Sequence, residues 1–171
     1  MLQKNDMVEV VERDTFLINK EWVERIKKKA QQHPKRRYRT CIHRDDGADV
    51  HEMLIAHTDQ TYVRPHKHRW HRESLHVVEG AATIILFQDN GEIDTVWRIG
   101  EVNRGRGFFY SLAPEVFHMM IIESPDLVFK ETTHGPFVAE DQIFADWAPS
   151  GGDVGRAWKY VDEVSQIIKN L

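Results

Sequence analysis

The sequence predicts an all-β-dominated domain, a single β-barrel of short strands with one helix before it and one after it. Short apolar segments separated by turn signals recur between residues 40 and 132, a pattern typical of a sandwich or barrel. Helical periodicity is confined to the two ends. At 171 residues and 41% hydrophobic, the chain suits one domain with a sizeable core. We divide it into a helical segment (1–35), a barrel (36–149) and a C-terminal helix (150–171).

The N-terminal helix is predicted from its cap and its apolar face. Asn19 can accept a hydrogen bond from the first helical turn, and Pro34 ends the helix shortly after Gln32. Four apolar residues share one face: Trp22, Val23, Ile26 and Ala30. Ten Lys or Arg residues lie between positions 20 and 44. They indicate either a solvated helix face with a basic end or an anion-attracting surface, and without interleaved aromatic residues the first interpretation is favoured over nucleic-acid binding.

The barrel is predicted from strand-like runs between turns. Asn90-Gly91 is a preferred tight-hairpin pair, and Asp45-Asp46-Gly47 and Ser124-Pro125-Asp126 also favour turns. The expected strands cover residues 40–42, 52–57, 82–88, 93–99, 108–112, 116–123 and 127–132. A second helix is expected to begin near Asp153. Its apolar face, which we expect to pack on the barrel or against a second subunit, comprises Ala157, Val161, Val164, Ile168 and Leu171.

The segment from Pro65 to Gly80 contains the spacing HxHxxxxE. Side chains two apart on a strand share a face, so His66 and His68 can bind one ion. Glu73 can return from the next strand after a four-residue turn. His118, in a later apolar strand, is the expected fourth ligand. His71 falls in the turn and His76 has the opposite strand parity from Glu73, so neither is expected to be a ligand.

Three imidazoles and one carboxylate would leave two open positions on an octahedral ion. Nitrogen and oxygen ligands suit one divalent transition metal ion, Fe, Mn, Ni, Co or Zn, and the absence of thiolate argues against a closed structural zinc site. The sequence therefore predicts an open metal site.

These motifs resemble the two metal motifs of the cupin superfamily. More narrowly, residues 62–68, Glu73-Ser74, residues 134–137 and residues 147–149 resemble the WbuC-type cupin fold metalloproteins. The resemblance covers about residues 36–149. It implies a cupin-type barrel (double-stranded β-helix or jelly roll) with one divalent metal, a homodimer, and a role in O-antigen or other surface polysaccharide biosynthesis. In the second motif, Ala113 and Glu115 stand where Pro and Gly are usual, so we expect that this turn does not depend on a positive φ.

Further site candidates come from polar and aromatic residues near the motifs. His43, Glu115 and Glu131 are the candidate catalytic acid or base groups, and a surface position is the competing interpretation. Arg39, whose fork suits phosphate or carboxylate, is a candidate substrate contact. So are Arg64, Tyr62 and Trp70, with core packing as the alternative for the aromatic residues.

The preferred function is that of a metal-dependent isomerase or epimerase acting on a small carbohydrate-derived substrate. An Fe-dependent dioxygenase and a non-enzymatic small-molecule binding module remain as alternatives. The single cysteine, Cys41, permits no intrachain disulfide, and the chain has neither a membrane-spanning apolar run nor a signal-peptide core at its start. We therefore expect a cytoplasmic protein with a small-molecule substrate and no nucleic-acid or membrane partner.

Overall fold

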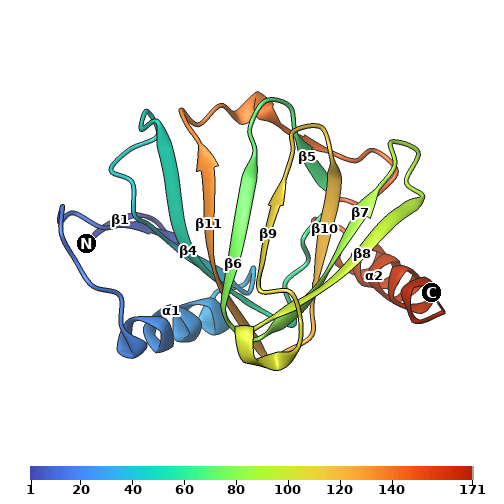
Figure 1. The fold of residues 1–171 in the computed structure, drawn as a ribbon, viewed down its shortest axis with the longest axis horizontal. Helices are drawn as coiled ribbons and strands as arrows, with labels where there is room; N and C mark the ends of the chain where they lie inside the picture. Colours follow the sequence, from blue (N-terminus) through green and yellow to red (C-terminus); the bar gives the residue numbers. More distant parts are fainter. Residues whose placement is uncertain (171) are drawn as a thin grey trace.

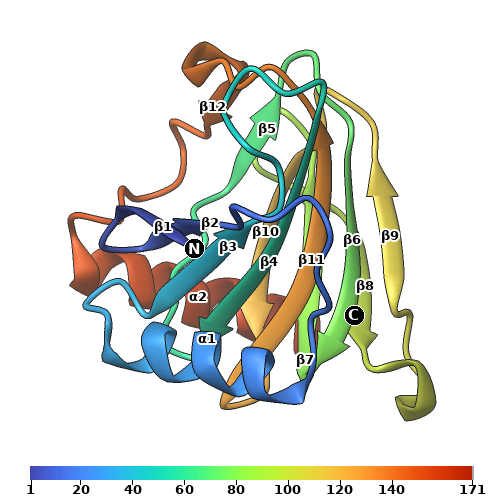
Figure 2. The same ribbon diagram turned by 90° about the vertical axis from the view of Figure 1, so that its left-hand side faces the viewer.

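Two β-sheets face one another, with one helix on the outer face of each (Figures 1 and 2). The computed structural model describes residues 1–170. Apart from the parallel pair β2 and β3, neighbouring strands are antiparallel. The seven-stranded sheet has the order β1 (Leu2–Asn5), β2 (Val8–Val10), β3 (Arg37–Cys41), β4 (Val50–Thr58), β11 (Asp126–His134), β6 (Glu73–Glu79) and β9 (Phe109–Leu112). The five-stranded sheet has the order β12 (Gln142–Phe144), β5 (His66–His68), β10 (Phe117–Ile122), β7 (Ala81–Phe87) and β8 (Ile93–Gly100).

This architecture confirms the predicted fold class, a mostly β jelly roll with a helix at each end. Short 3₁₀ turns occur at Val102–Arg104 and Ala139–Asp141. The core between the sheets takes alternate residues of facing strands, for example Leu75 and Val77 of β6 and Ile84 of β7. Because helices cover parts of both outer faces, residues 53–56 and 84–87 are buried on both sides of their sheets. Their sequences are therefore continuously apolar instead of alternating between apolar and polar residues.

Helix α1 (Lys20–Gln32) lies on the outer face of the seven-stranded sheet. As predicted, Asn19 caps it by accepting a hydrogen bond from the Trp22 backbone N–H at 3.1 Å. Its buried residues pack with apolar side chains of β3, β4 and β11. This cluster contains Val23, Ile26, Ala30, Tyr38, Leu54, Ala56 and Val128.

Helix α2 (Val154–Lys169) covers the outer face of the five-stranded sheet. Asp153 caps it through the Arg156 backbone N–H at 3.1 Å. The predicted apolar face therefore packs on the barrel of its own chain. The cluster contains Ile85, Phe87, Phe117, Met119, Ala145, Ala148, Val161 and Val164, and Ala157 is also buried. Leu171, the last residue of the predicted face, lies outside the described residues.

The N-terminal segment contains two short strands besides its helix. Strands β1 and β2 extend the sheet beyond β3, and the Glu9 side chain on β2 is 2% exposed. Its carboxylate accepts hydrogen bonds from Arg25 at 2.6 and 2.8 Å, from Lys29 at 2.8 Å and from Thr40 at 2.7 Å. Part of the basic segment 20–44 therefore joins α1 to the sheet.

Two turns next to the strands that carry Glu73 and His118 contain residues with positive φ. Gly80, between β6 and β7, has φ +93°, and a Cβ there would lie 2.3 Å from the Asp126 carbonyl oxygen, so only glycine fits. Glu115 precedes β10 with φ +65°. The expectation that this turn avoids positive φ was therefore wrong. The Glu115 N–H donates to the His68 carbonyl at 2.7 Å, a contact that fixes the turn against β5.

Candidate functional site

A group of potential metal ligands lies between the two sheets. His66 of β5 and His118 of β10 are directly opposite one another in register, and Glu73 begins β6 in the facing sheet. One ligand atom from each of these three residues lies within 4.8 Å of the others. Glu73 and His118 are buried, and His66 is partly buried. Three of the four predicted ligands are thus brought together.

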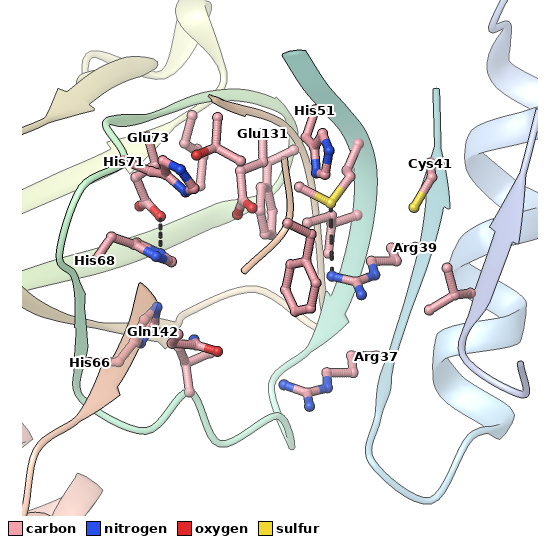
Figure 3. A pocket seen from close by; sticks show the side chains of 18 of the residues that line it. Arg37, Arg39, Cys41, His51, His66, His68, His71, Glu73, Glu131 and Gln142 are labelled. Atoms are coloured by element: carbon pink, nitrogen blue, oxygen red, sulfur yellow. Dashed lines mark hydrogen bonds and ion pairs between the residues drawn. The ribbon is translucent and has the colours of Figure 1, made fainter. Parts of the chain in front are cut away.

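The fourth predicted ligand, His68, lies beside this cluster. Its Nε2 is 3.4 Å from Glu73 Oε2, the contact drawn as a dashed line in Figure 3. Glu73 Oε1 lies 3.3 Å from His118 Nε2 and accepts a hydrogen bond from the Tyr110 hydroxyl at 3.2 Å. The carboxylate therefore lies between two of the imidazoles.

The outer nitrogens of all three imidazoles face oxygen acceptors. His66 Nδ1 donates to the Arg64 carbonyl at 2.9 Å, and His118 Nδ1 donates to the Val116 carbonyl at 3.0 Å. His68 Nδ1 donates to Asp141 Oδ2 at 2.9 Å. Since Nδ1 carries the proton in each ring, Nε2 is the nitrogen available to a metal.

Burial and mutual contacts shift the pKa values of these groups in opposite directions. Burial lowers the pKa of His66 to about 3, which keeps this imidazole neutral. Burial alone would raise the pKa of Glu73, but His118 and His68 hold it well below its ordinary value. Burial opposes a charge on His68, yet Glu73 and Asp141 raise its pKa to about 9. A metal ion bound by His68 would displace that proton.

The donor set fits a divalent transition metal. Three imidazole nitrogens and one carboxylate, each supported by an outer hydrogen bond, are typical ligands of Fe, Mn, Co, Ni or Zn. Cys41, the single thiol of the chain, is buried on β3, and burial raises its pKa. A possible His-His-Glu metal site in a cupin fold is therefore supported by the geometry.

The cluster opens into a cavity of about 420 Å³ between the sheets (Figure 3). Glu131 lines this cavity from β11, two residues before Thr133, which pairs with Glu73. Burial and the nearby Glu73 raise the pKa of Glu131 to about 7, against the opposing effect of Arg39. The site therefore contains a carboxyl group that can accept or donate a proton near neutral pH.

Two other predicted site residues also line the cavity, Arg39 and His43. His43 stacks on His51 with ring centroids 4.0 Å apart, and its Nδ1 lies 3.1 Å from the Glu52 carbonyl oxygen. Burial and the His51 ring lower the pKa of His43, so it is predominantly neutral at pH 7. Arg39 points toward the cavity from β3 (Figure 3).

The remaining four candidates do not line this cavity. Glu115 forms an ion pair with Lys67 at 2.7 Å and is exposed. The Arg64 guanidinium donates to the Ala145 carbonyl at 2.6 Å, and the Tyr62 hydroxyl donates to the Pro149 carbonyl at 2.9 Å. Trp70 is 59% exposed in the turn after β5. The contacts of Arg64 and Tyr62 join β5 and its approach to the chain that leads into α2.

Asp141 is a site residue that the sequence analysis missed. It is buried at the end of a 3₁₀ turn and contacts His68 Nδ1 at 2.9 Å, His71 Nδ1 at 3.2 Å and the Trp70 N–H at 2.8 Å. No spacing in the sequence connects it with His68, because the contact depends on the pairing of β12 with β5. Arg37, His51 and His57, which also line the cavity, were missed as well. The alternation Arg37-x-Arg39 was a usable signal for one of them.

The fold is of the cupin, or double-stranded β-helix, type, and the cluster of His66, Glu73 and His118 is a possible metal site within it. A sequence profile for a domain of unknown function (DUF6016) matches residues 18–99. No curated protein matches the chain. The narrower WbuC resemblance stays a prediction.

Solved structures with similar folds share little sequence with this chain. Protein SO0799 from Shewanella oneidensis aligns with a TM-score of 0.52 at 12% identity, over 66% of this chain and 76% of that one. CapF, solved with the inhibitor 3-isopropenyl-tropolone, aligns with a TM-score of 0.50 at 15% identity, over 62% of this chain and 31% of CapF. An uncharacterised Klebsiella pneumoniae protein with a double-stranded β-helix domain gives a TM-score of 0.48 at 14% identity, over 64% of this chain and 80% of that one. At these identities the first two support the fold alone.

Proposed function

We propose that this protein is a metal-dependent enzyme that moves a proton on a small, oxygen-rich substrate, as an isomerase or epimerase does. The observation that carries the proposal is Glu131, a partly buried carboxyl group with a pKa of about 7 in the same cavity as the metal-ligand cluster. A module that only binds a ligand would not require an acid or base there.

His66, His68, Glu73 and His118 would hold the ion. When bound, a divalent ion supplies a Lewis acid that polarises a carbonyl or hydroxyl oxygen of the substrate. The protein's own contribution is to fix these four side chains through their outer hydrogen bonds and to surround the reacting group with apolar residues. Leu75, Met120 and Phe129 line the cavity and reduce the water around it.

Glu131 is the proposed proton-transfer group. Its carboxylate form accepts a proton from a carbon next to a substrate carbonyl, and its carboxylic acid form returns the proton to the neighbouring carbon, which completes an isomerisation. An epimerisation would in addition require a second proton donor on the opposite face of the substrate. A pKa near 7 keeps both forms populated, so neither half of the transfer is strongly disfavoured. Arg39, on the same wall, is proposed to contact the substrate.

The proposed substrate class is a carbohydrate-derived molecule, and surface polysaccharide biosynthesis is the proposed context. The cavity volume of about 420 Å³ suits a small molecule, and polar residues such as His43, His51 and Thr133 line it. The sequence resemblance to WbuC-type proteins supports the polysaccharide context.

Deuterium exchange tests this function without knowledge of the product. The protein would be loaded in turn with Fe(II), Mn(II), Ni(II), Co(II) and Zn(II) and incubated in D₂O with a panel of aldoses, ketoses, uronic acids and sugar phosphates. We expect proton NMR to show metal-dependent loss of one carbon-bound proton signal for at least one substrate. Glu131→Gln should reduce this exchange by about 10²-fold or more without changing metal content. Glu115→Gln, on the exposed turn, is the matched control and should retain activity.

Three results would count against the proposal. Exchange that persists in Glu131→Gln would remove the proposed role of this residue. Oxygen uptake by the Fe(II) protein, without deuterium exchange, would favour a dioxygenase instead. Absence of both with every metal would favour a binding module.

A further inference from the structure

We propose that Arg37, Arg39 and His57 form a second subsite in the same cavity, one that binds a carboxylate or phosphoryl group. This subsite is distinct from the metal ligands. It deepens the proposed function by naming the charge that the substrate carries. The subsite can exist without the metal ion. It rests on the proposed function only for the identity of the part of the ligand that lies outside the subsite.

Strand geometry places the three side chains on one wall. Arg37 and Arg39 are two residues apart on β3, so both side chains project to the same face of the sheet. Arg37 is directly opposite His57 of the neighbouring strand β4. All three residues line the cavity, and Figure 3 shows both arginines directed into it from β3.

Neither guanidinium has a protein carboxylate as its partner. Among residues 1–170, Arg37 makes no side-chain hydrogen bond and no ion pair, and Arg39 has only a 3.8 Å contact with Met53 Sδ. By contrast, three basic side chains of α1 do have carboxylate partners. Arg25 and Lys29 both pair with the buried Glu9, and Lys27 pairs with Glu79. Burial and the positive charge of Arg39 lower the pKa of Arg37. Two like charges on neighbouring positions, one of them half-buried, are unfavourable without an anion.

His57 adds a buried group without a partner. It is 8% exposed, and its Nδ1 has no hydrogen-bond partner in the described part of the chain. Burial, together with Arg37, lowers the pKa of His57 to about 3, so this ring is neutral at pH 7. A neutral imidazole can donate one N–H to an anion. An unsatisfied polar group at the edge of a cavity is costly, and a ligand that accepts its hydrogen bond would offset that cost.

The chemistry of these groups selects an oxyanion. A guanidinium presents paired N–H donors that match the two oxygens of a carboxylate or of a phosphoryl group. Glu131 is the protein carboxylate whose charge interacts with Arg39, but in the described part of the chain it forms no ion pair with either arginine. A substrate with one anionic group at the arginines and hydroxyl or carbonyl oxygens elsewhere would therefore be a sugar acid or a sugar phosphate.

Anion binding by the metal-free protein tests this subsite. After chelation and removal of metal, the protein would be titrated separately with inorganic phosphate and with acetate at constant ionic strength in chloride, and binding would be followed by ¹H–¹⁵N NMR. We expect saturable shifts, and we expect Arg37→Gln and Arg39→Gln each to weaken binding about tenfold or more, as loss of a charged hydrogen bond does. Arg98→Gln, which removes the same charge from an exposed position on β8, should bind as the unaltered protein does.

A stability measurement separates a ligand-binding role from a structural one. If Arg37 serves an anion, Arg37→Gln should unfold at the same or higher urea concentration than the unaltered protein, because an unpaired half-buried charge has been removed. Arg37→Lys keeps the charge but loses the fork, and should bind weakly while remaining folded.

Preference for phosphate would identify a phosphorylated ligand, and preference for acetate would identify a sugar acid; both support the subsite. No saturable binding of either anion, or unchanged binding in both Gln variants, would overturn it. Because the titration uses metal-free protein, such a failure leaves the deuterium-exchange test of the proposed function unaffected.

Discussion

His68 differs from His66 and His118 in the group that accepts its Nδ1 hydrogen bond. His66 and His118 each donate Nδ1–H to a carbonyl two residues earlier in the chain, so the local backbone orients these rings. His68 donates instead to Asp141, which lies 73 residues away along the chain. The orientation of His68 therefore depends on one side chain from another strand, whereas the spacing HxH could predict only that the two histidines share a face.

Asp141→Asn should reduce metal affinity about 10- to 100-fold, the usual effect of losing an outer-shell partner of a metal-binding histidine. The amide keeps an oxygen that can accept from Trp70 N–H, so the turn should persist. Affinity would be measured by competition with a chromophoric chelator, with circular dichroism as the check on folding. Glu140→Gln, at the exposed neighbouring position, is the control. Equal affinities in the two variants would show that Asp141 does not support the ion through His68.

The sequence predicted the helices and strands whose caps, turn residues and apolar periodicity lie within or beside the element itself. Both helices had a cap and a repeated apolar face, and each longer strand had several apolar residues between turn residues. Strands β1, β2 and β12 have only three or four residues each, and their existence depends on pairing with distant segments. The same distinction applies to the site. His66, His68 and Glu73 lie within eight consecutive positions, whereas Asp141 and His57 reach it only through non-local pairing.

The contribution of the junction of β2, β3 and α1 to the free energy of unfolding should decrease in acid, because this junction contains the buried carboxylate of Glu9. Burial opposes ionisation, but Arg25, Lys29 and Thr40 lower the pKa of Glu9 from 4.5 to about 2. A carboxyl group whose pKa is lower in the folded state than in the unfolded state stabilises the protein fully at pH values above the unfolded-state pKa. That stabilisation is lost as the pH falls from about 4.5 to about 2, and it corresponds to about 3 kcal/mol.

Urea unfolding at a series of pH values would measure this contribution. Glu9→Gln should lower the free energy of unfolding by about 3 kcal/mol at pH 7, and the difference from the unaltered protein should shrink as the pH approaches 2. Glu12→Gln, at an exposed position nearby, should have little effect at any pH. A difference for Glu9→Gln that does not change with pH would assign the loss to packing rather than to charge.

For the whole molecule, the metal ligands come from both sheets. His66, His68 and His118 belong to the five-stranded sheet, and Glu73 belongs to the seven-stranded sheet. One ion held by all four would therefore link the two layers of the barrel at the level of the cavity, while α1 and α2 pack on the outer faces. Among the described residues, no helix is long and apolar enough to cross a membrane.

Metal removal should therefore lower the thermal stability of the entire fold. At a free metal concentration of 100 times Kd, binding to the folded state adds about 2.7 kcal/mol, which corresponds to a Tm change of roughly 5–10 °C for a domain of this size. Differential scanning calorimetry with and without chelator would measure the shift. His118→Ala should abolish most of it, while His76→Ala, at an exposed position on β6, should retain it. An equal metal-dependent shift in His118→Ala would mean that the ion stabilises the protein from another site, because the loss of one of four ligands should weaken binding at this one.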